Sequence, residues 1–185
     1  SSSAASDVYK RQDLYHMPFR TGGALSDAKD FDIQAGIESE MLTFATLDCG
    51  ADLVAHACGI MGSFNVISFE KYLIDEEITA MCDRLISGID CDGSHFCLDE
   101  IEKTGARGTF LKGRTPKMYR QEFYLPQFLN KEDPNQWMNR GAPGVYEICR
   151  EEVERRIASY QAPDITKEQN DLLTPYIPVE YREKI

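Results

Sequence analysis

Residues 53–61 read LVAHACGIM, an apolar run that only His56 interrupts. A continuous run of this kind predicts a strand buried on both faces, as in a parallel sheet. A mixed apolar run at residues 14–19 ends in a Gly-rich loop and predicts a second strand. Parallel strands need a crossover connection, which is usually a helix, so the intervening sequence should be helical.

Two helices are predicted beside these strands. Asp30 or Asp32 can cap a helix that Gly50 ends, and Ser68 can cap a longer helix that Gly88 ends. Their stripes at helical spacing are Ile33, Ile37, Met41, Phe44 and Ala45 in the first, and Lys71, Ile74, Ile78, Met81 and Leu85 in the second.

The order strand–helix–strand–helix over residues 14–88 predicts an α/β fold with parallel strands. Two strands alone do not form a stable sheet, so we expect further strands upstream and regard the chain as a C-terminal fragment. Residues 1–12, SSSAASDVYKRQ, include no initiator Met and show no periodicity, which is typical of adaptor or linker sequence rather than native fold.

The remaining sequence predicts mainly helices and loops. We expect a short helix over residues 97–103, a short extended run at 109–111 and a helix from Thr115-Pro116. A surface loop at 126–144 precedes an amphipathic helix at 145–160, and 161–185 should be an extended tail with a short helix near Lys167.

The composition excludes several classes of protein. The 185 residues carry a net charge of −11, which argues against nucleic-acid binding and favours cationic small molecules. No apolar stretch is long enough to span a membrane, and no signal-peptide core is present. We therefore expect a cytoplasmic protein whose six Cys are reduced.

Candidate site residues lie in the loops that leave the two predicted strands, at residues 21–29 and 59–67. Ligands of parallel α/β folds bind at the carboxyl ends of the strands, so these loops should share one rim. His56 is either a core histidine or a pocket group that hydrogen-bonds or transfers protons. Phe64, Phe69 and Tyr72 either pack the loop or form an aromatic wall for a cation.

Two clusters of polar residues can likewise be either part of a site or part of the helix structure. Asp27, Lys29, Asp32, Gln34 and Glu38 are either site residues or capping and solvated groups, while Glu70, Asp75, Glu76 and Glu77 fit the start of a helix favoured by its dipole. The stretch from Cys91 through His95 to Cys97, with Cys82 upstream, does not have zinc-site spacing and predicts a turn, so we expect no metal site.

Several separate strings resemble one family. They are GGALSDAKDFDIQAGIESE, ADLVAHACGIMGSFNVISFEKYLIDEEI, RLISGID, GARGTFL and RQEFYLPQF. Together they are similar to the C-terminal third of the trimethylamine methyltransferase family, over about residues 13–160. These corrinoid-dependent enzymes act on trimethylamine, glycine betaine and related quaternary amines.

The resemblance implies the C-terminal portion of a TIM (β/α)8 barrel, with the last βα units at 13–115 and C-terminal helices and a tail at 116–185. It implies methyl transfer from a methylated amine to Co(I) of a separate corrinoid protein, with no cofactor bound directly. His56 and Gly59 match a His-x-x-Gly string of the family. His56 becomes the catalytic candidate, and the substrate-binding candidates are Phe64, Asn65, Tyr72, Asp27 and Glu70.

The resemblance also bears on the substrate. Trimethylamine-specific members use pyrrolysine in the catalytic pocket, and this chain contains none, which favours a betaine if the pyrrolysine position falls within this stretch. We further expect a homo-oligomer that interacts with neither nucleic acid nor membrane. Two other hypotheses stay open: another barrel enzyme with His56 as general base, and a non-catalytic fragment.

Overall fold

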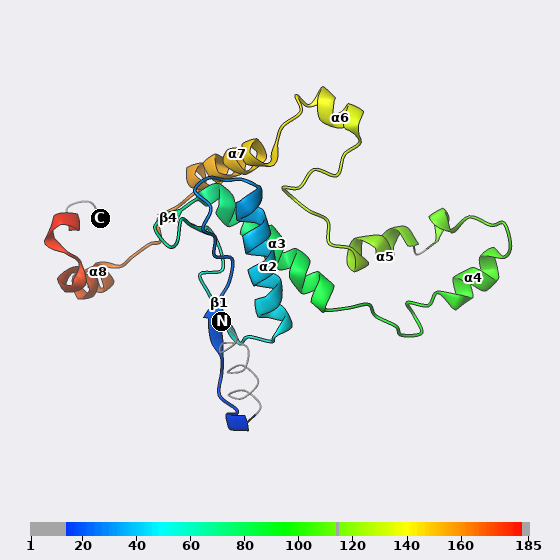
Figure 1. Cartoon of the computed structure of the whole chain (residues 1–185), viewed down its shortest axis with the longest axis horizontal. Helices are drawn as coiled ribbons and strands as arrows, with labels where there is room; N and C mark the ends of the chain where they lie inside the picture. Colours follow the sequence, from blue (N-terminus) through cyan, green and yellow to red (C-terminus); the bar gives the residue numbers. More distant parts are fainter. Residues whose placement is uncertain (1–13, 114, 183–185) are drawn as a thin grey trace. The chain divides into compact units, whose positions relative to one another are not determined.

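The computed structural model describes residues 14–113 and 115–182 (Figure 1). The predicted adaptor at 1–12 lies outside them. The chain divides into two compact units, one up to Val153 and one from Glu154 onward. The helices and strands are β1 (Arg20–Gly22), α2 (Ile33–Asp48), β2 (Leu53–Ala55), β3 (Ile60–Met61), β4 (Val66–Ile67), α3 (Phe69–Ile86), α4 (Leu98–Thr104), α5 (Thr115–Glu122), α6 (Pro134–Asn139), α7 (Val145–Ala158) and α8 (Lys167–Leu173).

The two sheets are small. β1 and β2 pair in parallel, with Arg20 opposite Leu53 and Gly22 opposite Ala55, and α2 is the crossover between them. This confirms the predicted strand–helix–strand unit. β3 and β4 form an antiparallel hairpin. The described residues thus show a mixed α/β fold that is mostly helical, and they form no closed barrel.

The prediction of one buried strand over residues 53–61 is wrong. β2 stops at Ala55 because His56 and Gly59 adopt left-handed conformations, with φ of 55° and 80°, and turn the chain into the hairpin. Leu53 is 58% exposed, so burial on both faces is also wrong. The prediction of a strand over residues 14–19 is wrong as well, since none of these residues is in a strand and β1 comprises Arg20–Gly22.

Both predicted helix caps are confirmed. Asp32 Oδ1 accepts a hydrogen bond from Ala35 N at 3.1 Å, and Ser68 Oγ accepts one from Lys71 N at 3.1 Å. Each bond satisfies a backbone N–H that would have no partner within the first turn of the helix.

The packed face of α2 differs from the prediction. α2 lies side by side with α3 (Figure 1). Most of the predicted apolar stripe is exposed, with Ile33 81% and Ile37 61% accessible, and Phe44 is half-buried. The buried residues of α2 are instead the small ones, Ala35, Ser39, Thr43 and Thr46. Small side chains allow the two helices to approach closely.

α3 buries three charged residues, of which only Lys71 belongs to the stripe predicted for this helix. Lys71, Asp75 and Glu77 are each at most 2% exposed. An apolar core lies beside them and contains Leu73 of α3, Phe128 of the segment that precedes α6, and Cys149 of α7. A second small core contains Ala28, Ala35 and Met61.

The C-terminal helices largely follow the predictions. α4, α5, α7 and α8 lie close to their expected positions, and Thr166 and Gln169 form a capping box at α8. Residues 110–112 form a 3-10 turn, and α6 interrupts the predicted loop because Asp133 caps a helix that begins at Pro134. Among the described residues, no helix is both long and apolar enough to cross a membrane.

Candidate functional site

The loops that follow β1 and β2 lie against each other at one edge of the parallel pair. Gly23 N donates to Ala55 O at 3.0 Å, and Gly62 N donates to Ala28 O at 3.0 Å. The carboxyl ends of parallel strands meet at the same edge, so these two loops form the predicted rim.

A cavity of about 270 Å³, here called the rim cavity, opens between these loops and α2. Glu38 Oε2 accepts hydrogen bonds from Ser26 Oγ at 2.7 Å and Asp27 N at 2.8 Å. The Ser26 hydroxyl, with Gln34 and the Asp27 amide, lowers the pKa of Glu38, which favours its charged form. The lining residues are Leu25, Ser26, Asp27, Glu38, Met41, Leu42, Ile60, Ser63 and Phe64.

Three of the candidate residues meet at this rim. Asp27 Oδ1 accepts a hydrogen bond from Ser63 Oγ at 2.6 Å. The rings of His56 and Phe64 contact edge to face, with centroids 5.4 Å apart. His56 is exposed just beyond β2, so the alternative of a core histidine is wrong.

The other three candidates are engaged elsewhere. Asn65 Nδ2 donates to Gly62 O at 2.7 Å and serves the hairpin turn. Glu70 Oε2 accepts from Ser68 Oγ at 3.1 Å, which fits the start of α3. Tyr72 is 43% exposed and lies on the first turn of α3, with its Cβ beside Gly59. None of the three lines the rim cavity.

The combined chemistry of the rim suits a cation with an apolar body. Asp27 and Glu38 supply two carboxylates, and the described lining residues include no Lys or Arg. Phe64 is 60% exposed and can present an aromatic face, to which a quaternary ammonium group is attracted. For Glu38 the sequence leaves both alternatives open, a site residue or a capping or solvated group, because it does not show that Ser26 and Asp27 fold onto this side chain.

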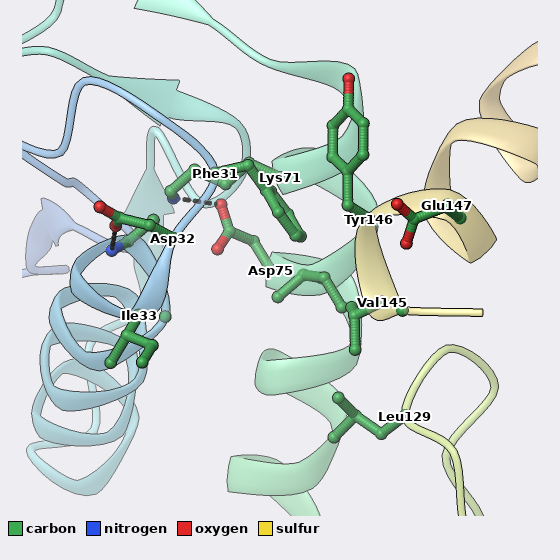
Figure 2. A pocket seen from close by; sticks show the side chains of 13 residues that line it. Phe31, Asp32, Ile33, Lys71, Asp75, Leu129, Val145, Tyr146 and Glu147 are labelled. Carbon is green, nitrogen blue, oxygen red and sulfur yellow. Dashed lines mark hydrogen bonds and ion pairs between the residues drawn. The ribbon is translucent and has the colours of Figure 1, made fainter. Parts of the chain in front are cut away.

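A second cavity, of about 430 Å³, lies between the starts of α2, α3 and α7 (Figure 2). Phe31 and Tyr146 contact there, with ring centroids 5.6 Å apart. Lys71 Nζ and Asp75 Oδ2 form an ion pair of 2.6 Å beside them. Burial raises the pKa of Asp75, and the Lys71 ammonium opposes that rise.

The sequence contains one signal of this buried ion pair. Lys71 falls in the stripe expected to face the core, and Asp75 follows it by four residues, so the two can meet on one face of α3. Lys and Asp are rarely fully buried unless they are paired.

The cysteines do not form a metal centre in the described part of the chain, where no group of three potential ligands gathers. The predicted turn is present: Asp92 Oδ1 accepts from Ser94 N at 2.8 Å and His95 N at 3.0 Å. Near the rim, burial and the negative charge of Asp75 raise the pKa of Cys58 to about 11, so its thiol is protonated at neutral pH.

The contacts of His95 predict that the attachment of this turn to Glu122 of α5 depends on pH. His95 Nδ1 lies 2.7 Å from Asp92 Oδ1 and its Nε2 3.1 Å from Glu122 Oε1. The hydrogen bond with Asp92, assisted by the charge of Glu122, raises the pKa of His95 above 6.5. A raised folded-state pKa gives stabilisation that is complete below pH 6.5 and lost as the pH rises through the folded value.

We therefore expect amide exchange in residues 89–97, corrected for the intrinsic pH effect, to accelerate as the pH rises above 6.5 through the raised pKa of His95. His95→Gln should remove this pH dependence, and Asp83→Asn on α3 serves as the control. An unchanged profile in His95→Gln would contradict the role of His95.

A parallel strand pair with a crossover helix, and an anionic, partly aromatic rim at its carboxyl edge, define a mixed α/β chain that carries a candidate site. The family model for trimethylamine methyltransferase (MTTB) matches residues 10–184. The chain therefore belongs to the trimethylamine methyltransferase family, which confirms the resemblance seen in its sequence.

Three relatives define its position in the family. The L-carnitine:corrinoid methyltransferase of Eubacterium limosum is 37% identical over 172 residues, which cover 91% of this chain and 35% of the relative. The proline betaine:corrinoid methyltransferase of the same organism is 39% identical over 167 residues (89% and 34%). The trimethylamine methyltransferase MttB of Methanosarcina barkeri is 26% identical over 158 residues (85% and 32%). The chain spans about a third of the length of these relatives.

Proposed function

We propose that the protein containing this chain transfers a methyl group from a quaternary amine to the Co(I) of a corrinoid protein. A Co–C bond forms with the electron pair of Co(I) as the N–CH3 bond breaks, and its electron pair stays on nitrogen. The leaving amine is neutral, so it needs no proton from the site. Residues 13–115 would be the last βα units of a barrel, and 116–185 its C-terminal helices and tail.

A betaine-type substrate is favoured over trimethylamine by the pattern of identities. The chain is 37–39% identical to the L-carnitine and proline betaine enzymes and 26% identical to the trimethylamine enzyme of M. barkeri. This difference is the observation that carries the proposal. The chain also contains no pyrrolysine.

The rim residues have complementary roles in this proposal. Phe64 would face the quaternary ammonium group, and Asp27 and Glu38 would supply negative charge around it. His56 would donate an N–H to the carboxylate that a betaine carries. Holding the cation rigidly would aim one methyl group at the cobalt, which is what a displacement reaction needs.

The test is methyl transfer by the longest reading frame that contains this sequence. The purified protein is mixed with a reduced corrinoid protein and with trimethylamine, glycine betaine, proline betaine or L-carnitine, and methyl-cobalt formation is followed by absorbance. We expect transfer from at least one betaine. Transfer from trimethylamine alone would overturn the substrate class, and conversion of a substrate without corrinoid would favour His56 as a general base.

Phe64 provides a sharper prediction. Phe64→Ala should weaken binding of the active betaine about tenfold, because a cation–π contact contributes roughly 1–2 kcal/mol. Phe64→Tyr keeps an aromatic face and should bind normally. Isothermal titration without the corrinoid protein measures both, and equal affinities for Ala and Tyr variants would contradict a cation on this ring.

A further inference from the structure

We propose that Lys71 and Asp75 are positioning residues whose buried ion pair holds both rim loops in place and so sets the shape of the rim cavity. The inference rests on the proposed function in one respect only: the rim is taken to be where the quaternary amine binds. Neither residue lines the rim cavity, so both would act through the loops.

The ion pair contacts each loop through the backbone. Lys71 Nζ donates to Ala24 O at 2.9 Å, three residues before Asp27. Asp75 Oδ2 accepts from Gly59 N at 2.7 Å, in the segment between His56 and Phe64. The same Asp75 oxygen accepts from Lys71 Nζ at 2.6 Å, so the two atoms of this ion pair connect the two loops to each other and to α3.

Burial makes this connection different from the other contacts between the loops. Lys71 and Asp75 are 1% and 0% exposed, whereas the Ser63–Asp27 hydrogen bond is exposed to solvent. A buried charged pair is little screened by water and salt, so its geometry is held closely.

Gly59 adds a reason why this loop cannot shift freely. Its φ is 80°, and a Cβ at this position would lie 3.1 Å from Ser68 O and 3.4 Å from Tyr72 Cβ. Gly59 O also accepts from Ser68 N at 3.0 Å, so the residue is bonded on both sides. The hairpin that carries Ser63 and Phe64 therefore begins at a point tied to the start of α3.

The decisive variant replaces both charges, Lys71→Met with Asp75→Leu. Exchanging a buried ion pair for apolar residues of similar size often leaves stability unchanged, whereas it removes the contacts to Ala24 and Gly59. The matched control is the surface pair Arg140→Gln with Glu132→Gln, whose side chains lie 2.7 Å apart away from the rim. Lys71→Met alone serves as a second variant, since it releases the Ala24 loop and keeps the Asp75–Gly59 contact.

Hydrogen exchange of the full-length protein is the first readout. In the double variant, amides of residues 24–28 and 59–65 should exchange at least about tenfold faster, while the central turns of α2 and α3 keep their wild-type rates. In Lys71→Met, residues 24–28 should accelerate more than 59–65. The control pair should change neither segment.

Activity is the second readout. With the betaine that the wild type demethylates, kcat/KM of the double variant should fall about a hundredfold, as expected when reacting groups move by about 1 Å. Unchanged amide exchange rates at residues 24–28 and 59–65 in the double variant would overturn the proposal that the ion pair positions the loops. Faster exchange in these loops with an unchanged kcat/KM would overturn it as well. If the wild type methylates no corrinoid, the proposed function fails, and the exchange data still decide whether the ion pair holds the loops.

Discussion

Glu77→Ala should destabilise the protein by roughly 3–5 kcal/mol, because it leaves one buried and two partly buried backbone N–H donors without their acceptor. The Glu77 carboxylate is 2% exposed and accepts hydrogen bonds from the backbone of three consecutive residues. Phe128 N lies 3.1 Å and Leu129 N 3.0 Å from Oε2, and Gln127 N donates to Oε1. Tyr124 OH lies 3.4 Å from Oε1.

The loss should extend beyond the hydrogen bonds. Phe128 belongs to the apolar core with Leu73 and Cys149, and Glu77 holds the backbone that places its ring there. Without the carboxylate, the segment 124–129 should detach from α3 and expose this core.

Urea denaturation monitored by circular dichroism measures the effect. Glu77→Gln keeps one acceptor oxygen and should lose less stability than Glu77→Ala. Asp83→Ala, at an exposed position on the same helix, is the control and should change stability by less than about 0.5 kcal/mol. A loss below about 1 kcal/mol in Glu77→Ala would contradict the anchoring role.

Lys71→Met should destabilise the fold by about 3–5 kcal/mol at pH 8, since it leaves the Asp75 carboxylate buried without its counter-charge. Asp75 is fully buried and its nearest cation is the Lys71 ammonium at 2.6 Å. The double replacement Lys71→Met with Asp75→Leu should recover most of this loss, because no uncompensated charge then remains.

The pH dependence has a defined sign. Burial raises the pKa of Asp75 in the folded protein, and loss of Lys71 should raise it further. A carboxyl with a raised folded-state pKa stabilises the fold most where it is protonated, and this contribution is lost as the pH rises through that pKa. Lys71→Met should thus be less destabilised at pH 5 than at pH 8 in urea denaturation. An equal loss at both pH values would show that Asp75 is not left charged and unpaired.

The exposed apolar side chains of α2 bear on the hypothesis of a non-catalytic fragment. Ile33, Ile37 and Met41 are each more than half exposed in the described structure. The 185 residues by themselves should therefore aggregate or bind an apolar dye such as ANS. A cooperative melt of this chain as a monomer, without dye binding, would contradict that expectation.

Local signals in the sequence located most elements. Asp32, Ser68 and the Thr166–Gln169 pair mark helix starts through hydrogen bonds that span three residues, so a short stretch of sequence contains both partners. The long apolar run at residues 53–61 led to the wrong prediction of a single strand. Apolar character does not distinguish a strand from a strand followed by a turn, and the positive φ of His56 is not evident from its residue type.

The sequence by itself determined the strand–helix–strand–helix order around α2 and α3, the parallel pairing of β1 with β2 and the membership of the family, whereas the β3–β4 hairpin and α6 were not predicted. The tertiary structure alone decided which charges are buried and which candidates meet at the rim. Lys71 and Ala24 are 47 residues apart, and Asp27 and Ser63 are 36 apart. Such contacts depend on how α2 and α3 pack, and the buried residues of α2 are small ones such as Ser39 rather than Ile33 and Ile37 of the predicted stripe. The spacing of residues along one helix cannot reveal which face the next helix will cover.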